Sequence, residues 1–520
     1  MRLPKVTSTA IVLLPCIAFI PLTIQIIEGS HAGGTSILKR FMLGAITPSV
    51  DPIVLQNAFH GIQVTIATAL ISWLLSIGIG TFLGVISSNL FWETINGYKF
   101  IGIFIRRILA IPRAIHELVW GLFILQILGL SPLVAIIAIT IPYSSLIARV
   151  ISNQIDTLNK RALIAIKQTG TSSLSTLTTY LVPSLSSILT TYGGYRLECA
   201  VRSATLLGVF GLGGIGTELQ LTLQSLQFRE LWSSLWILVG VMIILENTLS
   251  FLRNPNSPAN KGKNTNIYKI IIITSFVVIS LISLQSLEIK FDNFNLYPIQ
   301  WPNLIDIKSA LDQLPIVELI KSTTSLTLLA AGIAIATPPI CLMLFPGKLG
   351  SISFGILWIF LRLIPAPLIA LLLLLCTNPS ISVAALAIGL NNIGVLGRLL
   401  NENINNQNNL LFNAIKSSGA TTQISWLYGK LSPQSKSYLA FAAYRTDVLL
   451  RETAVVGVVG GVGLGWQLQE SLSSFNWAQV IVITIAFTTL TLIGELISDK
   501  IHAYWQRTTT DTSLRISLQT

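Results

Sequence analysis

The sequence predicts an all-α protein with about 12 membrane-spanning helices, arranged as two parallel six-helix repeats. Three observations predict this class: the composition, the succession of apolar runs and the similarity between the two halves. Of the 520 residues, 52% are hydrophobic and only 10% are charged, and the mean hydropathy is +0.72. Because soluble domains carry about 25% charged residues, this chain could not cover a soluble surface. Much of it is therefore expected to face the lipid bilayer.

The charge distribution excludes several function classes. The formal net charge is +12, and the basic residues stand mostly in short loops between apolar runs, as the positive-inside rule describes. No basic run has interleaved aromatic residues, so we expect no nucleic-acid partner. The four cysteines and four histidines have no metal-ligand spacing, so we expect no metal and no cofactor.

Twelve apolar runs are long enough to be considered as spanning helices, which need about 20 residues. They lie near residues 10–28, 62–88, 114–130, 133–150, 184–210, 232–252, 269–285, 322–345, 355–376, 381–397, 438–460 and 478–496. The polar stretch between the sixth and seventh runs is rich in Pro, Asn, Gly and Lys and is typical of a linker. The predicted division is therefore a first unit at 1–252, a cytoplasmic linker at 253–268 and a second unit at 269–520.

The N-terminus allows two interpretations. Arg2 and Lys5 precede an apolar run, as in a cleaved signal peptide. The run is long, however, contains Pro15 and Pro21, and lacks a small-x-small cleavage site, which favours an uncleaved first helix. The two cations then predict a cytoplasmic N-terminus.

The two halves are similar in sequence at a constant offset. Arg196 and Arg445 lie 249 positions apart, and the same offset joins other charged residues and glycines. Such an alignment of charges is not expected by chance, and it indicates a parallel duplication. A route for a solute between two such units is the natural consequence.

Two cytoplasmic loops repeat one pattern of small residues. The first reads AIKQTGTSSLSTLTTYLVP from Ala165 to Pro183, and the second reads AIKSSGATTQISWLYGKLSP from Ala414 to Pro433. The pattern resembles the EAA loop of ATP-binding-cassette (ABC) importer permeases, which docks as a short helix on the ATPase subunit. The docking residues that this resemblance implies are Ala165, Lys167, Gly170, Ala414, Lys416 and Gly419.

The loops depart from that pattern in two ways. Ile164 and Asn413 stand where the family has Glu, and the second loop is one residue longer between its Gly and its Pro. The alternative interpretation is an ordinary amphipathic connecting helix, which becomes less favoured because the pattern occurs twice.

Charged residues lie within the fifth apolar run of each half. Glu198 and Arg202 are spaced i, i+4 and can pair on one helix face, and Asp447 and Arg451 repeat the arrangement. A charge at bilayer depth costs about 2.5–3.5 kcal/mol on insertion scales, so such residues should face a cavity or the other half. Either they hold the halves in register, or the arginines ease an anion along a pathway, since guanidinium suits phosphorus oxyanions. The candidate pathway residues are Glu117, Arg196, Glu198, Arg202, Arg445, Asp447, Arg451 and Glu452.

Glycines follow these charges in both halves. The stretch from Gly211 to Gly216 formally matches G-x-G-x-x-G, but it follows an apolar helix and its copy breaks the pattern at Val462, so nucleotide binding is not expected. We expect close helix packing and a flexible bend instead. The glycines concerned are Gly208, Gly211, Gly214, Gly216, Gly457, Gly460, Gly463 and Gly465.

One acid has no copy. Glu117 stands in RAIHELVWGL, whereas the second half has LIPAPLIALL there. It could face the pathway or anchor the interface beside Trp120.

Taken together, HELVWGL, the two loops, the YR-x-E/D-x3-R pattern and the glycine block with its trailing ELQ resemble the permeases of phosphonate and phosphite ABC importers. The resemblance is strongest at 112–220 and 390–470, and the two fused units differ from members with one unit per chain. It implies the MetI-like permease fold, a multi-pass location in a bacterial inner membrane and alternating access. It also implies ATP hydrolysis on two cytoplasmic partner subunits and delivery of phosphonate, phosphite or a related anion by a periplasmic binding protein.

Two other classes remain to be weighed. A twelve-helix secondary transporter of a small anion, driven by an ion gradient, would explain the duplication but not the paired loops. A membrane enzyme would need a polar catalytic cluster, and the sequence contains no P-loop and no such cluster. We therefore predict a transport subunit with no catalytic residue.

Overall fold

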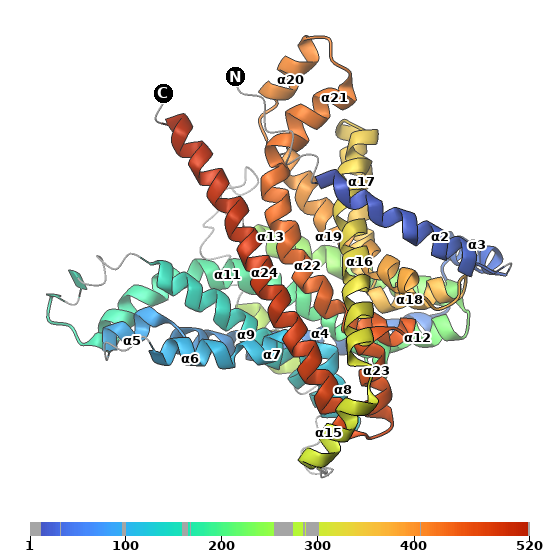
Figure 1. Cartoon of the computed structure of the whole chain (residues 1–520), viewed down its shortest axis with the longest axis horizontal. Helices are drawn as coiled ribbons and strands as arrows, with labels where there is room; N and C mark the ends of the chain where they lie inside the picture. The colour runs from blue at the N-terminus through green and yellow to red at the C-terminus, as the bar shows by residue number, and fades with distance from the viewer. Residues whose placement is uncertain are drawn as a thin grey trace. The chain divides into compact units, whose positions relative to one another are not determined.

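The computed structural model describes residues 12–31, 33–95, 100–158, 165–166, 168–253, 274–283, 287, 301–405 and 407–517. Within these ranges all regular structure is helical, apart from one isolated bridge between Ser30 and Thr377. The all-α prediction is confirmed for this part of the chain. The chain forms two compact units, one of residues 43–300 and one that combines 1–42 with 301–520 (Figure 1).

Six helices are long and apolar enough to cross a membrane. They are α4 (Pro52–Ile86), α9 (Pro132–Thr157), α13 (Phe228–Arg253), α16 (Ile316–Leu344), α19 (Ile381–Asn405) and α24 (Trp477–Ser517). Three bent helix pairs raise the number of candidate spans to nine. The protein is therefore a polytopic membrane protein with six to nine candidate spans in the described residues.

The three bent pairs each break within an apolar stretch. The first joins residues 100–114 to α8 (Glu117–Leu128) at 83°, and the second joins the end of α11 (Ser173–Leu207) to α12 (Ile215–Gln224) at 53°. The third joins α17 (Lys348–Leu363) to α18 (Ala366–Leu374) at 88°. The first of these pairs also contains α6 (Phe100–Ile108) and α7 (Ala110–Ala114).

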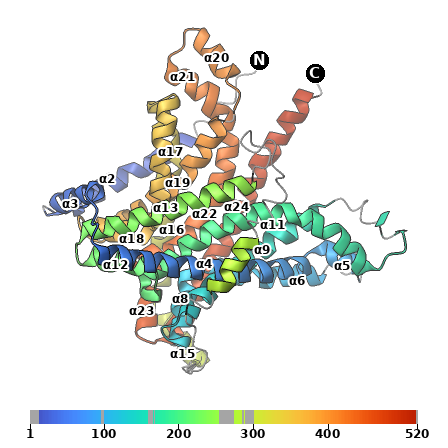
Figure 2. The same cartoon turned by 180° about the vertical axis from the view of Figure 1, so that it is seen from behind.

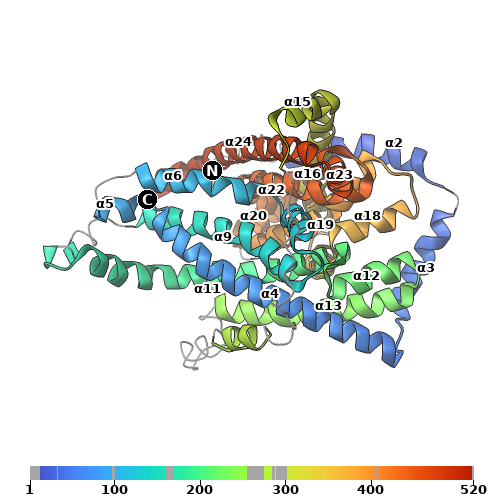
Figure 3. The same cartoon turned by 90° about the horizontal axis from the view of Figure 1, so that it is seen from below.

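The unit of residues 43–300 is built around α4. Asp51 caps this helix by accepting a hydrogen bond from the backbone N–H of Ile53, and Pro52 occupies its first turn. Helices α4, α9 and α11 lie side by side (Figure 3). Gly80 allows a close approach, because a Cβ atom there would lie 2.7 Å from the Cβ atom of Ile147.

The unit that contains residues 301–520 repeats this packing. Helix α16 contacts α19, α22 (Ser432–Gly460) and α23 (Gly463–Ser473), as α4 contacts α9, α11 and α12. Helix α24 packs on α22 and α23, as α13 packs on α11 and α12. Gly397 receives the indole ring of Trp358, since a Cβ atom there would lie 2.5 Å from the ring.

The first helix of each predicted half packs in the unit formed mainly by the other half. Helix α2 (Phe19–Gly29), with the preceding turn η1 (Leu14–Ala18), packs on α16 and α19, where Gly332 lies against Ala18. The helical residues 274–283 pack on α4 instead, with the rings of Phe276 and Trp73 6.1 Å apart. The compact units therefore differ from the predicted halves at both ends. The predicted linker lies outside the described residues apart from Arg253.

Within the unit that contains residues 301–520, two short helices lie at the same end as the C-terminal part of α24 (Figures 1 and 2). These are α20 (Leu410–Ser417) and α21 (Thr422–Trp426), and α15 (Leu304–Gln313) and α23 lie at the opposite end. In the other unit, α5 (Asn89–Ile95) lies at one end of α11 and α12 at the other.

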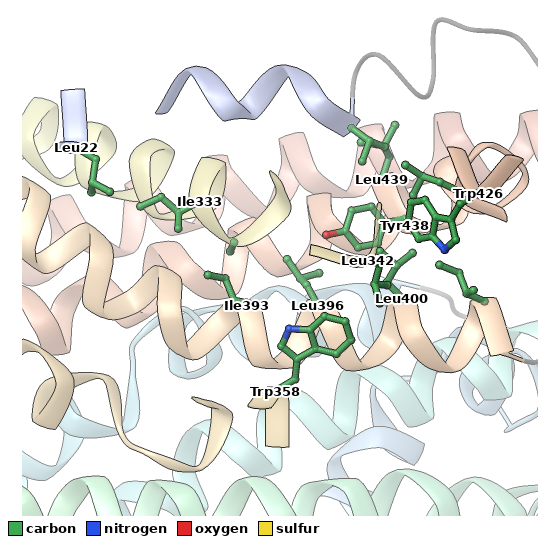
Figure 4. Close-up of a cluster of buried hydrophobic side chains, with 14 residues drawn as sticks. Leu22, Ile333, Leu342, Trp358, Ile393, Leu396, Leu400, Trp426, Tyr438 and Leu439 are labelled. Atoms are coloured by element: carbon green, nitrogen blue, oxygen red, sulfur yellow. The ribbon is translucent and has the colours of Figure 1, made fainter. Parts of the chain in front are cut away.

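A buried apolar cluster connects α21 to the core of its unit. Trp426, only 5% exposed, belongs to the same cluster as Tyr438, Leu342 and Trp358 (Figure 4). The hydroxyl of Tyr438 donates a hydrogen bond to the backbone carbonyl of Ile335 at 2.8 Å. The short helices are thus joined to the long ones by buried contacts.

Candidate functional site

The two repeated loops share a backbone turn at their central glycines. Gly170 has a φ of +84° and Gly419 a φ of +89°, and an added Cβ would meet no atom within 4 Å at either position. The next helix is capped in both loops two residues later, by Ser172 on the N–H of Ser175 and by Thr421 on the N–H of Ile424. Each loop therefore combines a sharp glycine turn with a capped helix start.

The predicted docking residues lie on exposed surface wherever they are described. Ala414, Lys416 and Gly419 are exposed in the second loop, and Ala165 and Gly170 are exposed in the first. Lys167 lies outside the described residues. The exposed turn is compatible with a docking helix.

Lys430 fixes the second loop to the end of α19. It is 8% exposed, and its Nζ atom donates to the backbone carbonyls of Ile404 at 3.3 Å and Gln407 at 3.4 Å. Burial lowers the pKa of this ammonium group. The sequence analysis missed Lys430, because its position in the loop gives no sign of burial.

The predicted i, i+4 pairs are both present. Arg202 donates to the carboxylate of Glu198, and Arg451 donates to that of Asp447. The two carboxylates are almost fully buried, with each side chain 3% exposed. Each pair bridges successive turns of a single helix, α11 or α22.

Arg196 lies among aromatic rings. Its guanidinium carbon is 4.9 Å from the ring centre of Tyr192 and 5.2 Å from that of Tyr143, and its Nε atom donates to the Tyr192 hydroxyl at 2.8 Å. The Tyr143 and Ser203 hydroxyl groups share a hydrogen bond of 2.8 Å, and Ser203 donates to Glu117. Arg196, Tyr143, Ser203 and Glu117 form one buried group, which we call the first cluster.

Arg445 lies in a corresponding group of the other unit. Its Nε atom donates to Oδ1 of Asn392 at 2.6 Å, and its Nη2 atom lies 3.1 Å from Oε1 of Glu452. Asn392 closes the triangle by donating to Oε2 of Glu452 at 2.7 Å. Arg445, Asn392 and Glu452 form the second cluster. The sequence analysis missed Asn392 and Tyr143, although they also lie 249 positions apart.

Two further buried arginines were missed. Arg113 and Arg362 are 8% and 6% exposed, and each stands in the last turn of the helix before the bend of its bent pair. The two arginines lie 249 positions apart, and this offset, which also relates the other repeated residues, could have identified them from the sequence. They add positive charge next to the start of α8 and of α18.

The glycine blocks form a tight turn in both units. Gly214 and Gly463 have φ values of +85° and +73°, and the next N–H donates to a threonine hydroxyl in each case. The donors are Ile215 to Thr65 at 2.9 Å and Leu464 to Thr323 at 3.0 Å. The turn is thereby attached to α4 in one unit and to α16 in the other.

The remaining glycines of the prediction differ in role. A Cβ added at Gly208 or Gly457 would lie within 2.7 Å of the carbonyl of Gly213 or Val462, so both sites need glycine for close packing. Gly211 has a φ of +87° in the short π-helical turn η2 (Gly208–Leu212), whereas Gly460 is the last residue of α22. The predicted close packing and bend are present, and flexibility stays a prediction.

We expect alanine at Gly216 or Gly465 to destabilise the protein by about 1–3 kcal/mol or more, because the site has no room for a methyl group. The added Cβ would lie 2.0 Å from the carbonyl oxygen of Thr205 or 2.5 Å from that of Ala454. Thermal unfolding of detergent-purified variants measures the loss. Gly78→Ala and Gly240→Ala are matched controls, since nothing lies within 4 Å there. Equal melting temperatures for all four variants would contradict the packing argument.

The structure brings the predicted site residues together in part. Within one unit Glu117 is connected to Arg196 through Ser203 and Tyr143, and within the other Glu452 contacts Arg445 directly. Glu198–Arg202 and Asp447–Arg451 form separate pairs. Among the described residues no group of three or more His, Cys, Asp or Glu side chains could hold a metal ion. Each cluster therefore contains one arginine and one carboxylate within a hydrogen-bonded group.

Residues 76–254 match the family of the binding-protein-dependent transport system inner membrane component. The match runs from within α4 to the end of α13. It includes the first loop and every residue of the first cluster. This part of the chain has the sequence of an inner-membrane permease component of an ABC importer, a multi-pass subunit that is not itself an enzyme. This class implies ATPase and substrate-binding partners, and it favours the ATP-driven importer over the secondary transporter.

Similar proteins extend over different shares of the chain. The phosphate-import permease protein PhnE of Mycolicibacterium smegmatis is 23% identical over 407 residues, 73% of this chain and 74% of that protein. The ABC transport system permease protein p69 of Mycoplasma genitalium is 25% identical over 495 residues, 89% of each chain. A putative phosphite transport system permease protein, HtxE of Stutzerimonas stutzeri, is 30% identical over 143 residues, 28% of this chain and 55% of that protein. No solved structure matches the chain.

Proposed function

We propose that this chain consists of two permease units fused in one polypeptide, which together form the whole transmembrane part of an importer for phosphonate, phosphite or a related phosphorus oxyanion. The observation that carries the proposal is the repetition, at one offset of 249 positions, of the glycine turn, the buried ion pair and the arginine cluster. Twelve spans, six in each unit, are part of this proposal.

The relatives support the fused arrangement. The permeases of M. smegmatis and M. genitalium align with most of this chain and have a similar length. The phosphite permease HtxE is about half as long as this chain, as expected for a protein with one unit. A single chain with two units would need no second permease subunit to form a pathway.

The proposed orientation places the N-terminus and both loops in the cytoplasm. One ATPase subunit would then dock on each loop, at Ala165, Lys167 and Gly170 and at Ala414, Lys416 and Gly419. ATP binding would draw the two loops together and change the pathway from inward-facing to outward-facing. A periplasmic binding protein would deliver the anion at the other face.

The chemistry of the clusters supports an oxyanion as substrate. Arginine and amide groups donate the hydrogen bonds that a phosphorus oxyanion accepts, and the guanidinium fork can bind two of its oxygens. Relatives are named for phosphate and for phosphite, which are anions of this kind. In this proposal the first and second clusters, with Arg196 and Arg445 at their centres, contact the passing anion.

Uptake of labelled phosphite, methylphosphonate and phosphate tests this function. Cells that express the chain with its ATPase and binding protein should accumulate at least one of these anions, and uptake should fall to background when the ATPase carries an inactivating substitution in its P-loop. Continued uptake without a working ATPase would contradict the proposal. Labelling of single cysteines placed in residues 165–170 and 414–419 must also report the same side of the membrane, because one motor cannot act on both sides.

A further inference from the structure

Each cluster contains one arginine and one carboxylate, but the carboxylates come from different helices, α8 in the first cluster and α22 in the second. Three pairs of positions correspond at the offset of 249: Tyr143 with Asn392, Arg196 with Arg445 and Ser203 with Glu452. In both units these positions contact one another through hydrogen bonds or a cation–π contact. The backbone arrangement is therefore repeated, although two of the three side chains differ.

The carboxylate changes place between the two clusters. In the first cluster it is Glu117, the first residue of α8, and position 203 holds the serine that donates to it. In the second unit the position that corresponds to Glu117 holds Ala366, the first residue of α18. The carboxylate of the second cluster is Glu452, which stands at the position that corresponds to Ser203. Each unit thus has one carboxylate in its cluster.

Both carboxylates that change place are largely buried. The side chains of Glu117 and Glu452 are 14% and 19% exposed, and a charge at membrane depth is costly unless it is paired. The separate pairs of Glu198 with Arg202 and Asp447 with Arg451 show that a within-helix ion pair is retained at the same positions in both units. In the clusters the position of the carboxylate is not retained, but one carboxylate in the hydrogen-bonded group of the arginine is.

The geometry points to Glu117 and Glu452 as equivalent positioning residues, each the built-in counter-charge of its cluster, which a passing oxyanion displaces. Glu452 contacts Arg445 directly, whereas Glu117 is connected to Arg196 through Ser203 and Tyr143. In the second cluster the two carboxylate oxygens of Glu452 take one hydrogen bond from Arg445 and one from Asn392. Two oxygens of a phosphorus oxyanion can accept the same two bonds. The nature of the anion rests on the proposed function, whereas the equivalence of the two carboxylates does not.

Relocating the carboxylate tests the equivalence directly. Glu452→Ser should lower ATP-dependent uptake by about tenfold or more and lower the melting temperature, because Arg445 loses its counter-charge in a buried site. Adding Ala366→Glu gives the second cluster the layout of the first and should restore uptake to within about threefold of wild type. Glu117→Ala and the double variant Glu117→Ala with Ser203→Glu are the mirror experiment, with the same expectation.

Two controls separate charge from packing. Glu452→Gln keeps the size of the side chain but not the charge, so it should lose uptake like Glu452→Ser, while Glu452→Asp should retain most of it. Ala366→Glu alone places two carboxylates in one cluster and should lower uptake. Wild-type uptake by Glu452→Gln would overturn the inference.

The melting temperature of purified protein in lipid nanodiscs separates this inference from the proposed function, because it needs no substrate. If wild type transports none of the three anions but relocation restores the melting temperature, the equivalence stands and the proposed function fails. If wild type transports an anion and both relocated double variants remain as impaired as the single variants, the inference is overturned and the proposed function stands.

Discussion

Valine at both Gly170 and Gly419 is expected to lower uptake by about tenfold or more while the partner ATPase continues to hydrolyse ATP. Both glycines have left-handed φ values, +84° and +89°, which cost an L-residue about 1–2 kcal/mol each. Nothing lies within 4 Å of an added Cβ, so the substitution changes the loop backbone and leaves the surrounding packing intact. The ratio of ATP hydrolysed to anion imported, measured in proteoliposomes, reports the loss of coupling.

Two controls accompany this double variant. Asparagine tolerates left-handed φ better than valine, so Gly170→Asn with Gly419→Asn should retain most of the coupling. Gly461→Val introduces the same kind of backbone strain at a φ of +64°, also with no atom within 4 Å, but at the far end of α22 from the loop. Unchanged coupling in the valine double variant, or an equal loss in Gly461→Val, would remove the docking role from the glycine turns.

The sequence predicted the features that depend on local spacing. Apolar runs marked the helices because lipid-facing and buried helices need continuous hydrophobic stretches. The spacing of Glu198 with Arg202 was sufficient to predict their ion pair, since residues four apart share a helix face. The offset between Gly170 and Gly419 predicted two loops of one kind, and both have the same left-handed turn.

Contacts between distant parts of the chain could not be predicted in this way. Asn392 and Glu452 are 60 positions apart and lie on different helices, so no periodicity relates them. The turn η1 before α2 packs beside Gly332, more than 300 positions along the chain, because small residues there allow a close approach. A boundary placed at the polar linker therefore could not anticipate which unit each first helix joins.

The number of spans shows a different limit of sequence reasoning. Helix α22 was predicted to span the membrane, yet it carries Arg445, Asp447, Arg451 and Glu452 and does not satisfy the apolar criterion that six other helices meet. Its charges are paired inside the unit, so the cost of burying them is offset by contacts that hydropathy does not register. A charged helix of this type is recognised only when its partners are known.

The ion pairs on α11 and α22 lead to the second large expected effect. Arg202→Gln combined with Arg451→Gln should sharply reduce the amount of folded protein in the membrane. The substitution leaves Glu198 and Asp447 buried without their arginine partners, which costs about 3–5 kcal/mol for each broken pair. Membrane level and melting temperature measure this loss independently of any substrate.

Neutralising both members of each pair separates a structural role from contact with the anion. The fourfold variant Glu198→Gln, Arg202→Gln, Asp447→Asn and Arg451→Gln leaves no buried charge unbalanced and should recover most of the melting temperature. If the pairs are structural, as their closed geometry within one helix favours, uptake recovers with stability. If stability recovers and uptake stays at background, Arg202 and Arg451 contact the passing anion, and the pathway extends along α11 and α22 beyond the two clusters.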